Sequence, residues 1–283
     1  MKIRDMECRK TQMQMIVENG LPMCNLQGFF IGNSLHFAGF EAIDMEDSPI
    51  DSYNMAIPID SIYHKICFCK QYDQQCKFFI LLHKREESQL GYEDNIYVKE
   101  FDLRGSKLVG SDFLRLNETQ FLRWWKQYSE FRQVKQYRPD AQGYLQSSYF
   151  DNLLAKDIEN GCALSWTFNI DGFLYDPQCH SKITAIIENR ISNKLSVEQY
   201  DPGRFFMSDT TVWNALKNVA EKMKIPLILC TYSRMNGSEN RFGAAIIDSV
   251  TNGLRYRNNI PPYKNVIDNL EHLRLWLQKN LNT

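Results

Sequence analysis

The pattern of apolar and polar positions divides the chain into a strand-rich first part and a second part in which helices and strands alternate. Up to about residue 116, short segments rich in aromatic and β-branched residues are separated by polar stretches that are typical of turns. We predict strands over 63–69, 77–83 and 95–101, with a further strand after Gly105. Together they would form an antiparallel meander with one face in water.

A helix is predicted to follow this β-rich part. Asn117 is an N-cap candidate, and Gln120 stands at the capping-box position. Aromatic residues then recur at helical spacing, which favours a face packed in the core over a platform that stacks on bases. The aromatic residues of this stripe are Phe121, Trp124, Trp125, Tyr128 and Phe131.

The segment 132–140 is basic and contains Pro139, which indicates a linker. We therefore predict two domains, a β-rich N-terminal domain over 1–140 that ends in the aromatic helix and an α/β domain over 141–283. We see no internal repeat and no low-complexity tract in the sequence.

In the second part the expected elements alternate regularly. The apolar spacing predicts a helix over 148–160, three strands, a helix, two strands and a closing helix. The predicted strands are 162–168, 171–175, 183–188, 226–232 and 242–248, and the later helices are 209–224 and 265–279.

A pair of acidic residues stands out on two of these strands. If 171–175 and 183–188 form a hairpin that turns at Cys179 and His180, Asp171 lies opposite Glu188. Arg190 then shares the face of Glu188, because side chains alternate along a strand. Two opposed carboxylates repel unless a positive charge lies between them. A divalent cation would supply that charge, and oxygen ligands suit Mg²⁺, with Mn²⁺ as a substitute. The alternative is that Asp171 caps a turn and Glu188 pairs with Arg190 on a solvated face.

With Asp171 in NIDGFLYDP and Glu188 in AIIENR, the segment 146–233 resembles the PD-(D/E)XK nuclease superfamily. The resemblance implies a restriction-endonuclease-like αβββαβ core, with an N-terminal antiparallel β-rich subdomain added here. It also implies that Asp171 and Glu188 hold Mg²⁺ together with the carbonyl of Asn189. The resemblance covers under a third of the chain.

Arg190 departs from the pattern of that superfamily, which carries lysine at this position. An arginine stays charged at all accessible pH values, so Arg190 can stabilise charge or orient water but cannot act as a base. Lys194, in the following loop, is a candidate for that role and for contact with nucleic acid. Arg204, beside two phenylalanines, is a second candidate phosphate contact, although turn chemistry at Asp201 explains its segment equally well.

Composition and charge limit the kinds of function that the sequence is compatible with. The formal net charge is -1, so a nucleic-acid surface would have to be a local patch. The 8 cysteines are spread unevenly, and the N-terminus MKIRDMECRK carries charges where a signal peptide is apolar. We expect reduced thiols in a cytoplasmic protein without a membrane partner.

Other chemistry has weaker support. His64, Cys67, Cys69 and Cys76 form a cluster that could bind zinc, but buried cysteines without a ligand explain it better. Nucleophile-elbow, catalytic-triad and Gly-rich phosphate-loop motifs are absent from the sequence.

The sequence therefore predicts a metal-dependent endonuclease that hydrolyses phosphodiester bonds, in double-stranded DNA and as a homodimer if the resemblance holds. Asp171, Glu188 and Arg190 would be its catalytic residues. The alternative is a catalytically inactive nuclease-fold protein that binds nucleic acid or protein, because Arg190 replaces the lysine.

Overall fold

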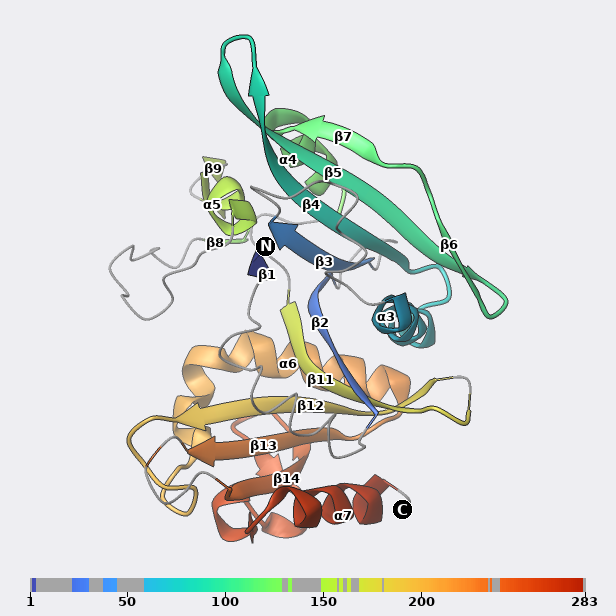
Figure 1. Cartoon of the computed structure of the whole chain (residues 1–283). Helices are drawn as coiled ribbons and strands as arrows, with labels where there is room; N and C mark the ends of the chain where they lie inside the picture. The colour runs from blue at the N-terminus through green and yellow to red at the C-terminus, as the bar shows by residue number, and fades with distance from the viewer. Residues whose placement is uncertain are drawn as a thin grey trace. The chain divides into compact units, whose positions relative to one another are not determined.

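The computed structural model forms two compact units, which we describe separately (Figure 1). Unit 1 contains Met1–Met6 and Leu26–Asn169, and unit 2 contains Glu7–Asn25 and Ile170–Thr283. The boundary predicted after residue 140 lies within unit 1. Across the part of the chain that the structure describes, no helix is both long and apolar enough to span a membrane. That part comprises residues 2–3, 22–30, 38–44, 59–128, 132–133, 149–156, 158–159, 162–163, 168–179, 181–233, 235 and 240–281.

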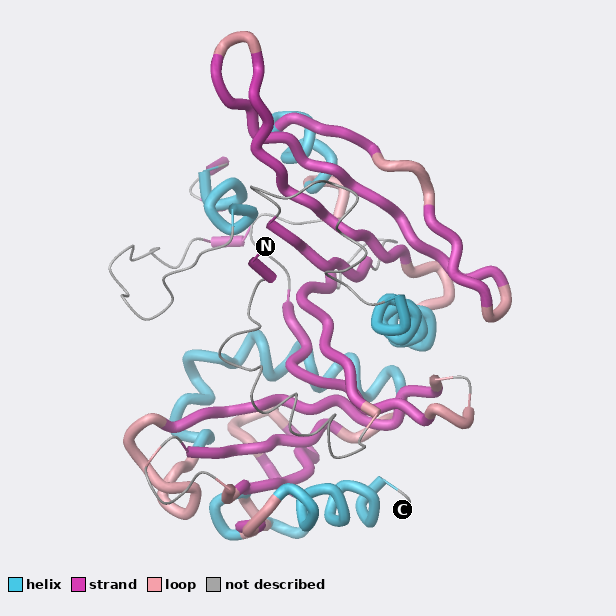
Figure 2. The backbone as a smooth tube through the Cα atoms, in the orientation of Figure 1, coloured by secondary structure: helices cyan, strands magenta, loops and turns pink. Residues whose placement is uncertain are grey.

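The sheet of unit 1 contains one helical crossover between parallel strands. Strand β2 (Met23–Phe30) pairs antiparallel with β3 (Ala38–Asp44), and β3 pairs parallel with β4 (Lys77–Ser88) through the helix α3 (Ile59–Tyr72). Only the Leu26–Phe30 part of β2 belongs to unit 1. The predicted strands 77–83 and 95–101 lie in β4 and β5, which form a long antiparallel hairpin, as expected for a meander (Figure 2). The parallel pair of β3 with β4 was not predicted. The other strands are β1 (Lys2–Ile3), β5 (Gly91–Arg104), β6 (Lys107–Gly110) and β7 (Leu114–Asn117), and the other helices are α4 (Glu118–Trp125) and α5 (Tyr149–Lys156).

The segment 63–69 is helical, so the strand predicted there is wrong. Its aromatic and β-branched composition suggested a strand, but its buried positions follow helical spacing. The buried residues Ile62, Lys65, Ile66 and Cys69 stand at positions i, i+3, i+4 and i+7, which lie on one side of α3. The periodicity of burial therefore overrides the β-propensity of the individual residues.

The cysteines of this segment lie on a helix and not on a strand. Because the segment is a helix, Cys67 and Cys69 do not share a sheet face; Cys69 is buried and Cys67 half-buried. The described residues contain no group of three or more His, Cys, Asp or Glu side chains that could hold a metal ion. Six cysteines in the described ranges are not joined in disulfides, and burial raises the pKa of Cys230 to about 12. These cysteines are Cys24, Cys67, Cys69, Cys76, Cys179 and Cys230.

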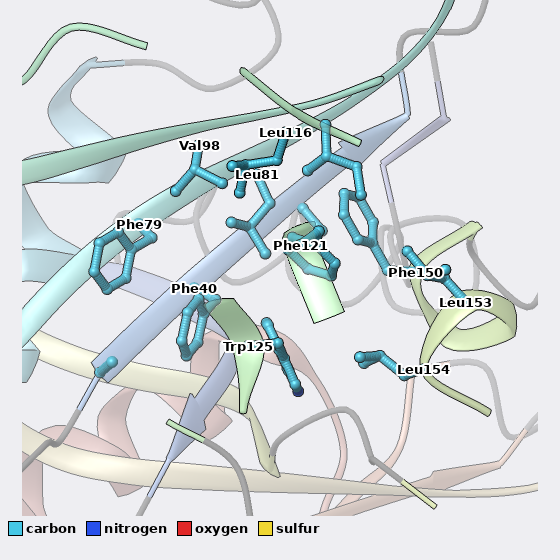
Figure 3. Packing of buried hydrophobic residues seen from close by; sticks show 13 residues of the cluster. Phe40, Phe79, Leu81, Val98, Leu116, Phe121, Trp125, Phe150, Leu153 and Leu154 are labelled. Atoms are coloured by element: carbon cyan, nitrogen blue, oxygen red, sulfur yellow. The ribbon is translucent and has the colours of Figure 1, made fainter. Parts of the chain in front are cut away.

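The predicted aromatic helix and its capping box are confirmed. The Asn117 side chain accepts a hydrogen bond from the Gln120 N–H at 2.9 Å, and the Gln120 side chain accepts one from the Asn117 N–H at 3.0 Å. Phe121 and Trp125 are fully buried in a core that includes Phe40 (Figure 3). The aromatic residues of this helix therefore pack in the core, as their spacing predicted. Phe131, the last residue of the predicted stripe, lies outside the described residues.

The start of the predicted αβββαβ core is not confirmed. Helix α5 ends at Lys156, and the strand expected over 162–168 is described only at Cys162–Ala163, as β10. This short strand pairs with β8 (Arg132–Gln133) and β9 (Ile158–Glu159) in a small separate sheet. Helix α5 and strand β10 both belong to unit 1, so they do not start the sheet that carries Asp171 and Glu188.

Unit 2 contains the later predicted elements, but the closing helix predicted over 265–279 begins only at Leu270, because Val266–Ile267 pair as a short strand with Phe242 and Gly243. Strand β11 (Phe168–Asp176) pairs antiparallel with β12 (Lys182–Ser192), and β12 pairs parallel with β13 (Leu227–Ser233) through the helix α6 (Phe206–Met223). Strand β14 (Phe242–Ser249) follows antiparallel. The chain is therefore mixed α/β with mostly antiparallel strands. The remaining elements are η2 (Pro202–Phe205), β15 (Arg255–Tyr256), η3 (Arg257–Asn259), η4 (Pro262–Lys264), β16 (Val266–Ile267) and α7 (Leu270–Leu281).

The two faces of the unit 2 sheet have different environments. Leu174 and Ile187 pack in a cluster with Leu273 and Leu277 of α7. Side chains alternate between the two faces along a strand. Near this point, the odd-numbered residues of β11 and the even-numbered residues of β12 therefore lie on the opposite face of the sheet, toward α6. The sheet thus places Asp171 and Glu188 on the α6 face.

Candidate functional site: the carboxylates of strands β11 and β12

The hairpin register predicted for the acidic pair is confirmed. Gly172 pairs with Ile187 and Phe173 with Ile186, which is the register that directs Asp171 toward Glu188. The register shifts only farther along the hairpin, between Leu174 and Tyr175. Both acidic side chains are buried, with 2% of Asp171 and 6% of Glu188 exposed.

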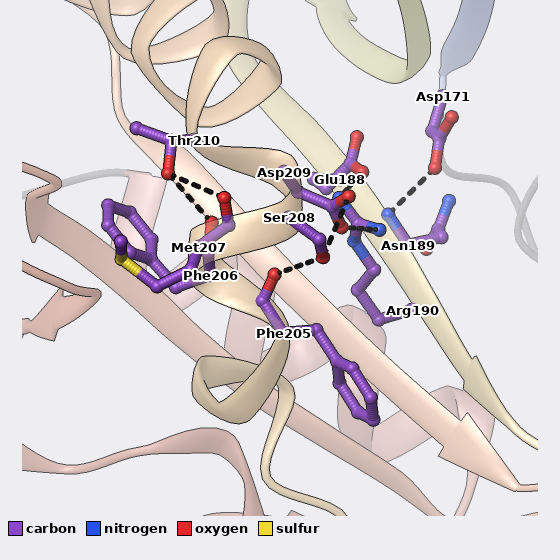
Figure 4. A network of polar contacts seen from close by, with 10 residues as sticks. All are labelled: Asp171, Glu188, Asn189, Arg190, Phe205, Phe206, Met207, Ser208, Asp209 and Thr210. Atoms are coloured by element: carbon purple, nitrogen blue, oxygen red, sulfur yellow. Dashed lines mark hydrogen bonds and ion pairs between the residues drawn. The ribbon is translucent and has the colours of Figure 1, made fainter. Parts of the chain in front are cut away.

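The two carboxylates have different partners (Figure 4). Asp171 Oδ2 accepts a hydrogen bond from the backbone N–H of Asn189 at 3.0 Å. Glu188 Oε1 forms an ion pair with Arg190 Nη2 at 3.0 Å. Glu188 and Arg190 therefore share a face of β12, as predicted. A bridging cation between Asp171 and Glu188 remains a prediction.

Arg190 is held by more than Glu188. Its Nη1 lies 2.8 Å from Asp209 Oδ2, and its guanidinium carbon lies 4.9 Å from the centre of the Trp213 ring. A guanidinium stacked on an indole ring gains a cation–π attraction, and its planar fork can bind two carboxylates at once. Because Asp209 and Trp213 belong to α6, Arg190 ties this helix to β12.

Asp209 and Trp213 were not identified as site residues from the sequence. Asp209 reads as an acidic residue in the first turn of a helix, where it interacts favourably with the helix dipole. Trp213 follows four residues later and reads as part of the buried face. The usable signal is this i, i+4 spacing, which places both side chains on one side of α6.

The described residues contain no group of three or more His, Cys, Asp or Glu side chains that could hold a metal ion, so a cation at this cluster would be held by two carboxylates. Mg²⁺ in proteins is commonly held by one or two carboxylates and keeps several waters. Asp171 and Glu188 supply the matching oxygen donors, provided that Arg190 Nη2 moves away from Glu188.

Two predicted nucleic-acid contacts lie outside this cluster. Lys194 is exposed in the turn after β12, where its backbone N–H donates to Ser192 Oγ at 3.3 Å. The Arg204 side chain is 71% exposed in η2, and its Nε lies 4.0 Å from Asp201 Oδ2. The structure places both on the surface and neither against Arg190.

Tyr200 is a buried phenol that interacts electrostatically with the cluster. Burial raises the pKa of Tyr200; nearby Arg190 lowers it, and nearby Asp209 raises it. With its pKa above the ordinary value, the phenol stays protonated at neutral pH. It can therefore donate a hydrogen bond but does not serve as a base.

We expect Arg190→Met to destabilise the protein by about 3 kcal/mol, because the substitution removes the guanidinium that pairs with buried Glu188. The matched control is Arg241→Met in the same unit, since Arg241 is 40% exposed and pairs with Glu198 and Asp268 at the surface. An exposed pair contributes roughly 1 kcal/mol or less. Urea unfolding of the three proteins measures both values, and equal losses for the two variants would contradict a structural role for the Glu188–Arg190 pair.

Comparison with known proteins does not assign a family. No family model matches the chain, and no curated protein matches it. The crystal structure of the sex pheromone staph-cAM373 precursor aligns over 87% of this chain and 89% of its own, at 12% identity and a TM-score of 0.20. The C-terminal domain of sex pheromone staph-cAM373 precursor from Staphylococcus aureus aligns over 78% of this chain and 63% of its own, at 8% identity and a TM-score of 0.13. These scores are too low to support a shared fold or function.

Proposed function

We propose that unit 2 hydrolyses phosphodiester bonds in DNA with a divalent cation held by Asp171 and Glu188. The observation that carries this proposal is the pair of buried carboxylates on neighbouring strands, in the predicted register and beside one guanidinium. The order β11, β12, α6, β13 also supports it, because it agrees with the last four elements of the αβββαβ core. The resemblance to PD-(D/E)XK nucleases is thus retained for residues 168–233 alone.

The residues of the cluster would divide the chemistry between them. Mg²⁺ in such a site polarises the phosphate and lowers the pKa of a bound water. Asp171 and Glu188 would hold the ion, and Asp171 would keep its position through the Asn189 N–H. Arg190 would give up Glu188 but keep Asp209 and Trp213, so its charge would remain beside the scissile phosphate.

Plasmid nicking in Mn²⁺ tests the proposal. The wild type should nick supercoiled plasmid, and Glu188→Ala should abolish nicking because a cation ligand is lost. Arg190→Ala should reduce the rate on the order of 10²-fold or more, because the variant loses one electrostatic contact in the transition state. Arg190→Lys should keep or raise the rate, since lysine retains the charge and can also exchange a proton.

The matched control for lost carboxylates is Glu221→Ala, an exposed residue on the same helix as Asp209. It should nick like the wild type. Equal nicking by the wild type, Glu188→Ala and Arg190→Ala would show that the active site lies elsewhere. Absence of nicking in the wild type and in Arg190→Lys would exclude hydrolysis by this site.

A second candidate function is binding of nucleic acid without hydrolysis. Its support is the observation that Arg190 already has two carboxylate partners and a stacked indole ring, so the cluster is stabilised without an added cation. Lys194 and Arg204 would then be surface contacts to phosphate, and the charged cluster would hold α6 on the sheet.

Salt-dependent DNA binding tests these two contacts. If both side chains contact phosphate, Lys194→Ala/Arg204→Ala should weaken binding of any duplex sequence and lower the slope of log K against log[salt] by about 1.8. The control Arg104→Ala/Lys107→Ala removes the same charge from the exposed β5–β6 turn of unit 1. An unchanged slope, or the same change in the control, would contradict phosphate contacts at these positions.

A further inference from the structure

Both units contain the same succession of elements. In unit 1 an antiparallel pair, β2 and β3, is followed by α3 and by β4, which lies parallel to β3. In unit 2 the antiparallel pair β11 and β12 is followed by α6 and by β13, which lies parallel to β12. No internal repeat is apparent in the sequence, so this agreement is a finding of the structure (Figure 1).

Strands β2 and β11, which begin the two successions, correspond in sequence and in register. The segments are LQGFF (26–30) in unit 1 and IDGFL (170–174) in unit 2. Gly28 pairs with Phe40, and Gly172 pairs with Ile187, so both glycines have the same place in their hairpins. This register makes Gln27 the counterpart of Asp171.

The hydrogen bond of Asp171 is repeated by Gln27. Gln27 Oε1 accepts from the backbone N–H of Ala42 at 2.9 Å, and Asp171 Oδ2 accepts from the backbone N–H of Asn189 at 3.0 Å. Ala42 and Asn189 each follow a glutamate directly. The same side-chain position thus binds the same backbone position in both units.

Those glutamates are themselves counterparts. Glu41 lies beside Ile80 of the parallel strand, as Glu188 lies beside Leu229. Glu41 is 2% exposed. Its Oε1 lies 2.7 Å from Nζ of Lys65, a residue of α3 that is itself 4% exposed. Glu41 therefore faces the crossover helix of its unit.

The positive partner comes from a different place in each unit. Arg190 stands two residues after Glu188, and the corresponding residue after Glu41 is Ile43, which carries no charge. Lys65 on the crossover helix supplies the charge instead. Both units thus have a glutamate at the same strand position, but its positively charged partner comes from a different element. This indicates that the buried carboxylate requires a positive charge beside it, whichever residue supplies that charge.

We propose that unit 1 carries a second copy of the carboxylate site, in which the Lys65 ammonium group occupies the cation position beside Glu41. External cations cannot enter this second site while the Lys65 ammonium group is present. Removal of the Lys65 side chain opens the position beside Glu41 to a small cation. The inference does not depend on hydrolysis by unit 2. If the proposed hydrolysis holds, the external cation binds in unit 2 and not beside Glu41.

Thermal unfolding of the full chain tests the cation position. Lys65→Ala should lower the melting temperature by about 10 °C, because buried Glu41 loses its partner. Methylammonium chloride, which restores an ammonium group, should raise the melting temperature of Lys65→Ala more than the same concentration of sodium chloride does. The control Lys65→Ala/Glu41→Gln should melt above Lys65→Ala and respond equally to both salts. A Lys65→Ala protein that melts like the wild type, or that responds equally to both salts, would overturn the proposal.

A reciprocal substitution tests the equivalence even if Lys65→Ala does not fold. Gln27 shows that a glutamine at this strand position accepts the backbone hydrogen bond. Asp171→Gln should therefore melt within a few degrees of the wild type, whereas Asp171→Leu, which has no acceptor, should melt clearly lower. Equal melting temperatures for the two Asp171 variants would contradict the correspondence between the units.

Discussion

Burial of a carboxylate against a sheet is the constraint on which the structure of both units depends. A buried glutamate is stable as an anion only with a positive partner and hydrogen bonds. Glu41 meets this requirement through Lys65 of α3, and Glu188 through Arg190, which reaches Asp209 of α6. In each unit the charge balance therefore also fixes the crossover helix relative to the strand that carries the glutamate.

The two ion pairs, Glu41–Lys65 and Glu188–Arg190, differ in their exposure and in their further partners. Lys65 and Glu41 are both nearly inaccessible, so their ion pair is shielded from solvent. Arg190 is 25% exposed, and Asp209 gives it an alternative partner if Glu188 binds a cation. Unit 2 thus differs from unit 1 in that its positive side chain is partly exposed and contacts a second carboxylate.

The sequence predicted the site better than it predicted the first unit. Alternation and a short turn were enough to place Asp171 opposite Glu188, because register in a hairpin is a local property. The Arg190–Asp209 pair joins a strand to a helix that begins sixteen residues later, and local periodicity carries no information about such a contact. Segment 63–69 was assigned to a strand because its residue types outweighed its helical spacing. The correspondence of LQGFF with IDGFL is too short to detect without the register of the strands.

The central claim is that Asp171 and Glu188 together bind a divalent cation. Crystals of the protein soaked in MnCl₂ test it most directly through the anomalous scattering of manganese. Our account predicts an anomalous peak within about 2.3 Å of an oxygen of each carboxylate, the range of hard-cation oxygen bonds, with Arg190 Nη2 displaced from Glu188. Crystals without such a peak, in which Arg190 still pairs with Glu188 at high manganese concentration, would contradict it.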